Sequence, residues 1–249
     1  MNALGIIPAR YASTRLPGKP LADIGGKSMI QRVYEQASKT LPHVVVATDD
    51  ERILKAVEKF GGKAVMTSAL HRSGTDRCKE ALEIMEQQLS MPIHIVINIQ
   101  GDEPFLNPAH LSLLVQSFHD DTTTEIATLA TPLKKNDDLF NPNYVKVVHN
   151  KHKQALYFSR SPIPYVRNHN REEWLSHHCF LKHIGIYAYQ SHILKKIAAL
   201  PPTPLEKAES LEQNRWLENG FVIKIECVDD EGLSVDTPED LEKARRQCR

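Results

Sequence analysis

The sequence predicts a mixed α/β protein with a mostly parallel central sheet, helices on both faces of that sheet, and a small antiparallel hairpin region. Apolar runs of strand length alternate with segments of helical periodicity through the first half of the chain. The runs 44–47 and 94–99 are almost continuously apolar, which is typical of parallel strands buried on both faces. Past Glu125 the strands follow one another more closely, and two of them are joined by a short polar turn at 150–153.

In the first half, each expected helix has its own stop or start signal. In the first helix, Met29, Val33 and Ala37 share one face. The second helix ends at the two glycines of 61–62. Asn107 is the expected cap of a helix whose first residue is proline. The expected strands are 4–7, 44–47, 63–67 and 94–99, and the expected helices are 29–39, 51–60, 76–89 and 108–118.

The second half predicts more strands at closer spacing and ends in a helix. Thr237 caps this last helix, proline follows it, and two acidic residues lie in the first turn, where the helix dipole favours negative charge. The segment 167–178 is polar and is expected to form loop or short helix. The expected strands are 126–131, 145–149, 155–159, 183–189 and 222–228, and the expected helices are 193–200, 204–219 and 237–246.

Composition excludes several classes of protein. The 31 basic and 31 acidic residues balance, so no global field attracts nucleic acid or a membrane surface, and any anion site must be local. No apolar run approaches the roughly 20 residues of a membrane span, and the N-terminus does not resemble a signal peptide, so we expect a cytoplasmic protein. The four cysteines form no CxxC pair. In His177-His178-Cys179, adjacent residues of a strand would point to opposite faces, which disfavours a metal site.

A cationic loop follows the first strand. Arg10, Arg15 and Lys19 lie close together, and Pro17 and Pro20 prevent the loop from becoming helix. Ligands of open α/β sheets bind at the carboxyl ends of strands, so a polyanion such as a nucleoside triphosphate fits this loop. The alternative is a solvated surface loop that happens to be basic.

Two nucleotide-binding patterns are absent. The tripeptide Gly26-Lys27-Ser28 suggests a P-loop, but that motif needs a glycine where this chain has Leu21. No GxGxxG occurs either. A nucleotide must therefore be bound by another arrangement.

Two carboxylates are candidate metal ligands. Asp102 directly follows an apolar strand, and Asp236 lies between a short extended piece and the last helix. Mg²⁺ prefers one or two carboxylates together with phosphate oxygens and water. The alternatives are that Asp102 only ends a strand and that Asp236 only belongs to a helix cap, although Thr237 already fills the capping position.

The loop Arg72–Arg77 enters a helix and is a candidate for reading a base. Thr75 is expected to cap the helix and to present its hydroxyl and amide to a ligand, with Arg77 nearby. The alternative is a plain helix cap without a ligand.

Motifs in both halves resemble one family. RYASTRLPGKPL, SGTDR, NIQGDEP, YFSRSPIP, HIGIYAY, ESLEQNRWLENG and VDTPEDLEKAR occur in this order between about residue 3 and about residue 246. Together they resemble the 3-deoxy-manno-octulosonate (Kdo) cytidylyltransferases, also called CMP-Kdo synthetases. The first motif is shared with the related CMP-sialic acid synthetases, whereas QGDEP, SRSPIP, HxGxY and LEQxR are specific to the Kdo enzymes.

The resemblance implies a Rossmann-like nucleotidyltransferase fold in a single domain, 1–249, that forms a homodimer. In it, 1–125 would mainly bind the nucleotide and 126–249 would mainly bind the sugar and form the dimer, with the hairpin 145–159 as candidate interface. The implied reaction joins CTP and Kdo to give CMP-Kdo and pyrophosphate with Mg²⁺, which activates Kdo for lipopolysaccharide synthesis. No nucleic acid or membrane partner is implied.

The resemblance also assigns site residues. Catalytic roles fall to Arg10, Arg15, Lys19 and Asp102, and the metal pair is Asp102 and Asp236. Nucleotide contacts are expected from Arg10, Ser13, Arg15, Lys19, Ser73, Thr75, Asp76 and Arg77. The sugar pocket is expected to contain Gln100, Arg160, His183, Tyr187, Glu212 and Gln213.

The chemistry suits these roles, although four of the sugar residues have an alternative. The guanidinium fork of Arg160 matches the planar carboxylate of Kdo. Tyr187 and His183 are equally compatible with a packed core, and Glu212 and Gln213 lie on a helix where polar residues usually face water.

Three other functions compete with this one. A cytidylyltransferase for another 2-keto sugar acid, such as a sialic acid, would share the cationic loop and differ in the sugar pocket. A non-catalytic nucleotide sensor would lack one carboxylate of the metal pair. A glycosyltransferase of similar fold would carry an Asp-x-Asp motif after a strand, where this chain has Gln100-Gly101-Asp102.

Overall fold

The structure, a computed structural model, describes residues 1–12 and 16–248. The chain divides into two compact units. Unit 1 comprises Met1–Val115, Ala188–Ala198 and Gly232–Arg249, and unit 2 comprises Gln116–Tyr187 and Ala199–Glu231. The division therefore does not follow a single cut in the sequence, since the C-terminal segment belongs with the N-terminal one.

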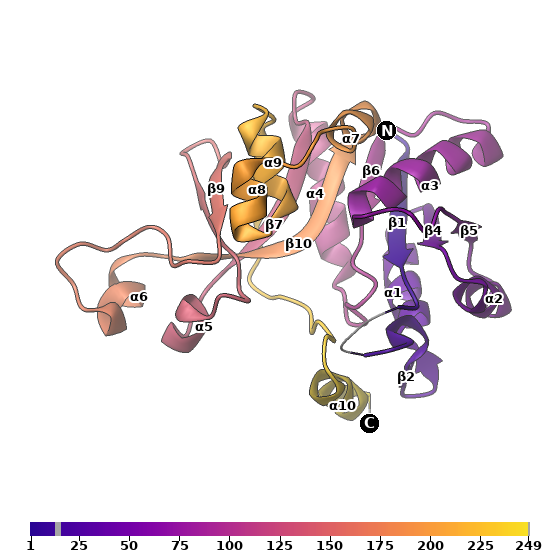
Figure 1. The fold of residues 1–249 in the computed structure, drawn as a ribbon, viewed down its shortest axis with the longest axis horizontal. Coiled ribbons are helices and arrows are strands. Elements are labelled where there is room, and N and C mark those ends of the chain that lie inside the picture. Colours follow the sequence, from indigo (N-terminus) through magenta and orange to yellow (C-terminus); the bar gives the residue numbers. More distant parts are fainter. Residues whose placement is uncertain (13–15, 249) are drawn as a thin grey trace. The chain divides into compact units, whose positions relative to one another are not determined.

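Unit 1 holds a parallel sheet with the strand order β6-β1-β4-β5 (Figure 1). Its strands are β1 (Ala3–Ala9), β4 (His43–Thr48), β5 (Ala64–Met66) and β6 (Ile95–Asn98), with a two-stranded hairpin of β2 (Asp23–Ile24) and β3 (Lys27–Ser28). Its helices are η1 (Lys19–Leu21), α1 (Met29–Ser38), α2 (Glu51–Lys59), α3 (Gly74–Leu89), α7 (Ser191–Ile197) and α10 (Pro238–Gln247). The helix α4 (Pro108–Asp120) and the strand β10 (Leu181–Gln190) contribute residues to both units.

The central strand β1 is covered on both faces. Ile6 and Ile7 point to opposite faces of the sheet, and both are 0% exposed. Helices α1 and α3 both pack against this strand. The predicted parallel sheet flanked by helices is thus confirmed.

Unit 2 combines parallel and antiparallel strands. It contains β7 (Ile126–Pro132), α5 (Asn136–Phe140), β8 (Lys146–His149), β9 (Ala155–Ser159), η2 (Arg171–Glu173), α6 (Trp174–His177), α8 (Pro204–Glu209), α9 (Glu212–Glu218) and β11 (Ile223–Cys227). Strand β11 runs parallel to β7, and β8 pairs antiparallel with β9 and with β10. The antiparallel hairpin expected from the sequence is confirmed.

One predicted helix, 204–219, is wrong in its continuity, because the structure has two helices there. Ser210 adopts a left-handed conformation with φ of 51°, which ends α8 before α9 begins. The side chain of Glu209 accepts hydrogen bonds from Ser159 Oγ (2.6 Å) and from the backbone N–H of Arg160 (2.9 Å). The break between the two helices is therefore accompanied by contacts with the end of β9, about 50 residues earlier in the chain. The periodicity of apolar residues along a helix cannot predict such contacts.

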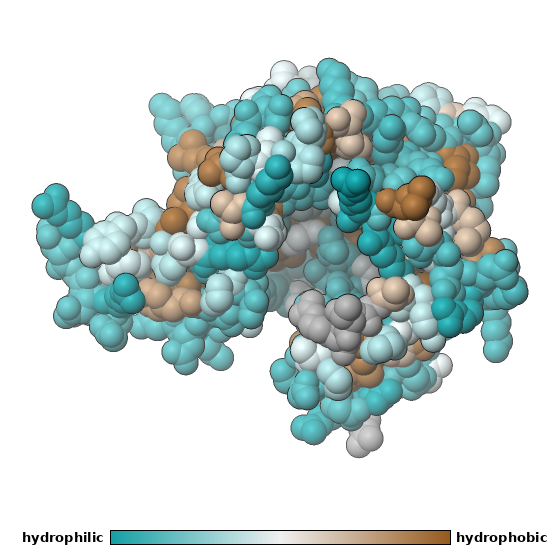
Figure 2. Space-filling view, in the orientation of Figure 1, coloured by the Kyte–Doolittle hydropathy of each residue, from teal (hydrophilic) through white to brown (hydrophobic). Residues whose placement is uncertain are grey.

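The face of the molecule in Figure 2 is mostly hydrophilic, with apolar residues in small separate groups. Leu70 and Tyr165 are among the most exposed apolar side chains, at 88% and 73%. Over the described ranges 1–12 and 16–248, no helix has both the length and the apolar character needed to cross a membrane.

Candidate active site

A cavity of about 330 Å³ lies at the carboxyl ends of β1 and β6 in unit 1. The two strands are parallel neighbours, with Ile6 opposite Asn98, so the segments that follow them emerge at the same edge of the sheet. The cavity is lined by Pro8, Ala9, Arg10, Ala12, Lys19, Pro20, Gln100, Gly101, Asp102 and Asp236. It thus gathers Arg10, Lys19, Gln100, Asp102 and Asp236 from the residues singled out in the sequence.

Lys19 lies between the two carboxylates. Its Nζ donates to Asp102 Oδ2 at 2.6 Å and to Asp236 Oδ1 at 3.1 Å. The preceding Gly18 has φ of 69°, a left-handed conformation that favours glycine, and its N–H donates to the carbonyl of Tyr11 at 3.1 Å. This turn closes the cationic loop and starts η1 with Lys19 as its first residue.

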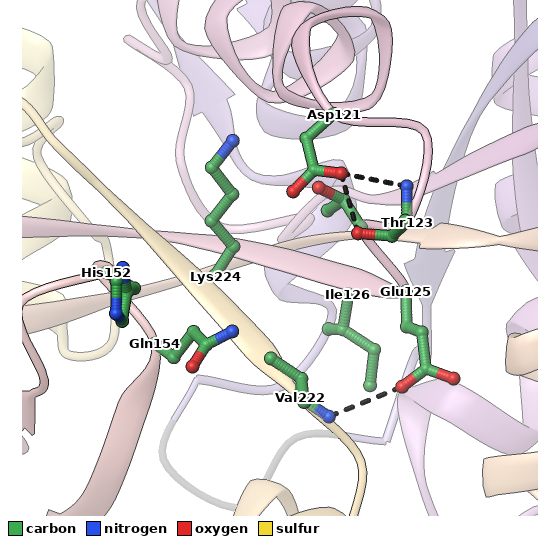
Figure 3. Close-up of a pocket in the computed structure, with 9 residues that line it drawn as sticks. Asp121, Thr123, Glu125, Ile126, His152, Gln154, Val222 and Lys224 are labelled. Carbon is green, nitrogen blue, oxygen red and sulfur yellow. Dashed lines mark hydrogen bonds between the residues drawn. The ribbon is translucent and has the colours of Figure 1, made fainter.

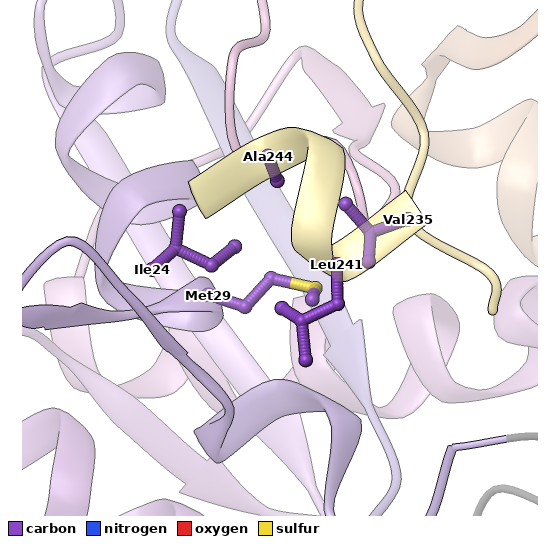
Figure 4. Close-up of a cluster of buried hydrophobic side chains, with 5 residues drawn as sticks. All are labelled: Ile24, Met29, Val235, Leu241 and Ala244. Carbon is purple, nitrogen blue, oxygen red and sulfur yellow. The ribbon is translucent and has the colours of Figure 1, made fainter. Parts of the chain in front are cut away.

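Asp236 is brought to the cavity by the packing of α10. Val235 donates its backbone N–H to the carbonyl of Asp102 at 2.9 Å, so the two carboxylates come from adjacent backbone segments. Thr237 accepts from the N–H of Asp240 in a capping box, which confirms that Thr237 is the cap and leaves the Asp236 carboxylate for the cavity. Figure 4 shows the apolar cluster that holds this segment, formed by Ile24, Met29, Val235, Leu241 and Ala244.

The carboxylate pair fits a divalent cation. The Lys19 ammonium shows that one positive centre can contact an oxygen of each carboxylate. In the part of the chain that the structure describes, no group of three or more His, Cys, Asp or Glu side chains could hold a metal. A metal bound by these two carboxylates would therefore complete its coordination with water or with phosphate oxygens, as Mg²⁺ commonly does.

The other described cation of the loop, Arg10, has a different partner. Its Nη2 donates to the backbone carbonyl of His71, in the segment that connects β5 to α3. Ser13 and Arg15, which the sequence also assigned to nucleotide binding, lie outside the described residues.

The start of α3 is arranged differently from the prediction for Thr75. Ser73, in an extended conformation with φ of −130°, is the cap, and it forms a capping box with Asp76. The prediction that Thr75 caps the helix is therefore wrong, because Gly74 already belongs to the helix. Thr75 is only 1% exposed.

Arg77 is buried rather than open to solvent. Its side chain is 0% exposed, and it donates to Asp49 Oδ2 at 2.9 Å and to Thr67 Oγ1 at 2.6 Å. These contacts tie the first turn of α3 to the ends of β4 and β5.

In unit 2, His183, Tyr187 and Glu212 lie near one another. The rings of His183 and Tyr187 are 5.2 Å apart between centroids, and Tyr187 packs edge-on against Trp216. Burial lowers the pKa of His183 to about 3, so the ring is neutral at ordinary pH. Burial, and to a lesser degree the charge of Glu212, raises the pKa of Tyr187 well above its usual value.

The two residues that begin α9, Glu212 and Gln213, are both held within unit 2. Gln213 is 6% exposed, and Glu212 accepts from Arg215 Nη2 at 2.6 Å. These side chains therefore do not simply face water, as the alternative from the sequence supposed.

Arg160 is separately held by backbone carbonyls. Its guanidinium donates to the carbonyls of Glu209 (2.7 Å), Pro142 (3.0 Å) and Ser210 (3.4 Å). The carbonyl of Arg160 in turn accepts from the buried Lys146 at 2.6 Å. Three of the five guanidinium N–H groups are thus used within unit 2, which fixes the direction of the side chain.

A second cavity, of about 220 Å³, lies within unit 2 (Figure 3). Two carboxylates in its lining already accept hydrogen bonds: Asp121 from Thr123, and Glu125 from the N–H of Val222 at 3.4 Å. Its lining also includes His152, Gln154 and Lys224. It contains none of the residues that the sequence assigned to binding or catalysis.

Comparison with known proteins places the chain in a family. A family model described as cytidylyltransferase matches residues 4–226. A protein of Parabacteroides distasonis named 3-deoxy-manno-octulosonate cytidylyltransferase is 56% identical over 248 residues, which are 98% of this chain and 97% of the relative. The chain belongs to this family. A protein of Bacteroides thetaiotaomicron with the same name is 55% identical and covers 98% of this chain and 97% of its own length.

A solved structure gives the same result in three dimensions. The CMP:2-keto-3-deoxy-manno-octonic acid synthetase complexed with CTP is 46% identical, with a TM-score of 0.91 and coverage of 99% of this chain and 98% of its own. The resemblance inferred from the sequence motifs is thus confirmed, and the chain is a cytidylyltransferase of nucleotidyltransferase fold.

Sequence reasoning missed three residues around the cavity and the start of α3. Asp49 pairs with Arg77, and Glu80 contacts His71, whose carbonyl holds Arg10. The spacing of Arg77 and Glu80, three residues apart on one helix, could have indicated that both face the same segment. Their partners lie far enough away in the sequence that no local pattern reveals them.

Proposed function

We propose that this chain transfers the cytidylyl group of CTP to the anomeric hydroxyl of Kdo, releasing pyrophosphate and giving CMP-Kdo. The observation that carries the proposal is the convergence of Arg10, Lys19, Asp102 and Asp236 on one cavity at the carboxyl edge of the sheet. The names of relatives that align over nearly the whole chain support Kdo as the acceptor. The product would supply activated Kdo for lipopolysaccharide synthesis.

The chain would act by positioning and by neutralising charge. The hydroxyl must attack the α-phosphate in line with the departing pyrophosphate, and no covalent intermediate with the protein is needed. Lys19 and Arg10 line the cavity, where their cations would stabilise the negative charge that develops on pyrophosphate, and we assign Arg15 the same role from the sequence. Ser13, Ser73, Thr75, Asp76 and Arg77 remain our candidates for the nucleotide, directly or by shaping its loop.

We propose that Asp102 and Asp236 hold Mg²⁺. The cation would supply Lewis-acid polarisation and a lower pKa of the attacking hydroxyl. With such a cation bound, the Lys19 ammonium would give up part of its contact with the two carboxylates and would be available to a phosphate.

For the sugar we propose mainly hydrogen-bonding residues. Arg160 offers its remaining N–H groups to the Kdo carboxylate, and Gln100 lines the unit 1 cavity. Neutral His183 and Tyr187, together with the polar side chains of Glu212 and Gln213, would serve the hydroxyl groups.

The test is pyrophosphate release from CTP and Mg²⁺ with Kdo, with a sialic acid, and with no acceptor. We expect release with Kdo alone. Release with the sialic acid instead would show that the enzyme uses a different sugar acid as acceptor. CTP binding without release in any arm would favour a nucleotide sensor, and EDTA is expected to stop the reaction if the metal assignment holds.

We also propose a cytoplasmic homodimer. Leu156 on β9 is 60% exposed, so the β8–β9 hairpin offers an apolar side chain to a second copy. Light scattering coupled to size exclusion should give twice the 28.2 kDa chain mass, and Leu156→Asp should shift the protein toward monomer. A monomeric wild type would contradict the proposal.

A further inference from the structure

The position of Arg10 depends on a segment from elsewhere in unit 1. Arg10 follows β1 at the edge of the cavity, and its guanidinium donates to the backbone carbonyl of His71. Lys19, in contrast, is held by two carboxylates of the cavity itself. The geometry of segment 67–73 therefore sets where the Arg10 charge lies.

Glu80 on α3 holds this segment at two points. Its Oε2 accepts the backbone N–H of Ser68 at 2.8 Å and contacts His71 Nε2. One carboxylate oxygen thus joins residues 68 and 71, so it closes the turn between them. Leu70, inside that turn, is 88% exposed and adds little packing.

The ends of the segment are fixed by other contacts. Thr67 donates its N–H to the carbonyl of Thr48 at 2.8 Å, and buried Arg77 donates to Thr67 Oγ1. Ser73 is fixed by the capping box of α3. Among these contacts, those of Glu80 act on the middle of the segment, where the carbonyl that binds Arg10 lies.

Glu80 carries the charge that this arrangement needs. Burial raises its pKa, but the hydrogen bonds from Ser68 and His71 more than offset this, so the pKa lies below its usual value. The side chain is 34% exposed and belongs to no apolar cluster, so its removal should leave the core intact.

We propose that Glu80 and His71 are positioning residues for nucleotide binding, which act by holding the His71 carbonyl against Arg10. The inference rests on the proposed function, since it takes Arg10 to bind the CTP triphosphate. Neither side chain needs to touch the nucleotide. Their loss should weaken CTP binding while leaving the affinity for Kdo unchanged.

The experiment compares Glu80→Ala with Glu83→Ala. Glu83 is an exposed residue on the same helix and serves as a matched control. For Glu80→Ala and for His71→Ala we expect the KM for CTP to rise about tenfold, with the KM for Kdo and the thermal midpoint nearly unchanged, because a misplaced Arg10 loses charge-assisted binding of the triphosphate in the ground state. Glu80→Gln, which can still accept both hydrogen bonds, should lie between Glu80→Ala and wild type.

A double-mutant cycle with Arg10→Ala separates positioning from other roles. If Glu80 acts through Arg10, then Glu80→Ala should change the KM for CTP by less than about twofold in the Arg10→Ala background. Equal factors in both backgrounds, or equal KM values for Glu80→Ala and Glu83→Ala, would overturn the proposal. A Glu80→Ala protein that fails to fold would be replaced by Glu80→Gln and His71→Ala in the same cycle.

CTP affinity measured by calorimetry, without acceptor, keeps this inference separate from the proposed function. If wild type binds CTP and turns over with Kdo while the cycle shows no coupling, the positioning role alone fails. If wild type neither binds CTP nor releases pyrophosphate, the proposed function fails, and the positioning role with it.

Discussion

The candidate site residues of unit 1 and of unit 2 differ in whether their side chains are charged. In unit 1, Lys19 lies between two carboxylates, so the cavity holds opposite charges in contact. In unit 2, burial lowers the pKa of His183 and raises that of Tyr187, so both side chains are uncharged. The difference follows the chemistry proposed for each group, because phosphates and a metal need charge, whereas sugar hydroxyls need directed hydrogen bonds.

The largest expected effect is on the carboxylate pair. Asp102→Asn keeps the shape of the side chain but removes the charge that faces Lys19 and any metal, so we expect turnover to fall by at least about 10³-fold. Because Asp102 is on the cavity surface, the thermal midpoint should change little. Asp229→Asn, at an exposed position, is the control and should retain full activity. An active Asp102→Asn protein would show that the unit 1 site does not depend on the charge of this carboxylate, which contradicts the contrast drawn between the two units.

Lys19→Met tests whether the ammonium and a metal share the same carboxylates. We expect turnover to fall by about 10²-fold, since the cation for pyrophosphate is lost. At the same time, Mn²⁺ should bind the nucleotide-free variant more tightly than wild type, because both carboxylates lose their competing partner. Electron paramagnetic resonance of free Mn²⁺ measures this binding without any turnover. Weaker Mn²⁺ binding in the variant would contradict a shared site.

His183 should make stability depend on pH. Above pH 6.5 the ring is neutral in the folded and the unfolded chain. Below 6.5 the unfolded chain takes up a proton that the folded site refuses until about pH 3, so the free energy of unfolding falls as pH falls through this window. The half-buried ring keeps some contact with water, so we expect about 1–2 kcal/mol of loss at pH 5.

Urea unfolding at pH 7.5 and pH 5.0 measures this loss. The change between the two pH values should be smaller in His183→Phe than in wild type by the same amount. The same substitution at His119, which is exposed on α4, should leave the change as in wild type. Equal pH sensitivity of wild type and His183→Phe would show that His183 titrates normally in the folded protein.

The smallest effect is expected at Tyr187. Tyr187→Phe removes one uncharged hydrogen-bonding group, which is worth about 0.5–1.5 kcal/mol, so the KM for Kdo should rise about three- to tenfold. The KM for CTP should stay the same. Tyr189→Phe is the matched control two residues along β10, and it should leave both constants unchanged. A rise in the KM for CTP with Tyr187→Phe would place the residue in a different role.

Local signals in the sequence were enough for much of the fold. The continuous apolar runs predict that β1, β4 and β6 are buried strands, since these runs are too short for a buried helix. Thr237, followed by proline and acidic residues, determines the start of α10, because the cap and the helix dipole act within one turn. The motifs also determined the family, since they occur in order along almost the whole chain.

The tertiary structure alone decided how residues far apart in the sequence meet. Asp102 and Asp236 share Lys19 because Val235 pairs with the backbone of Asp102 and because α10 packs on Ile24 and Met29. The break between α8 and α9, and the contact of Glu80 with His71 that holds Arg10, have the same origin. Periodicity and capping are properties of neighbours along the chain, whereas these contacts depend on packing energies between segments that only the folded chain brings together.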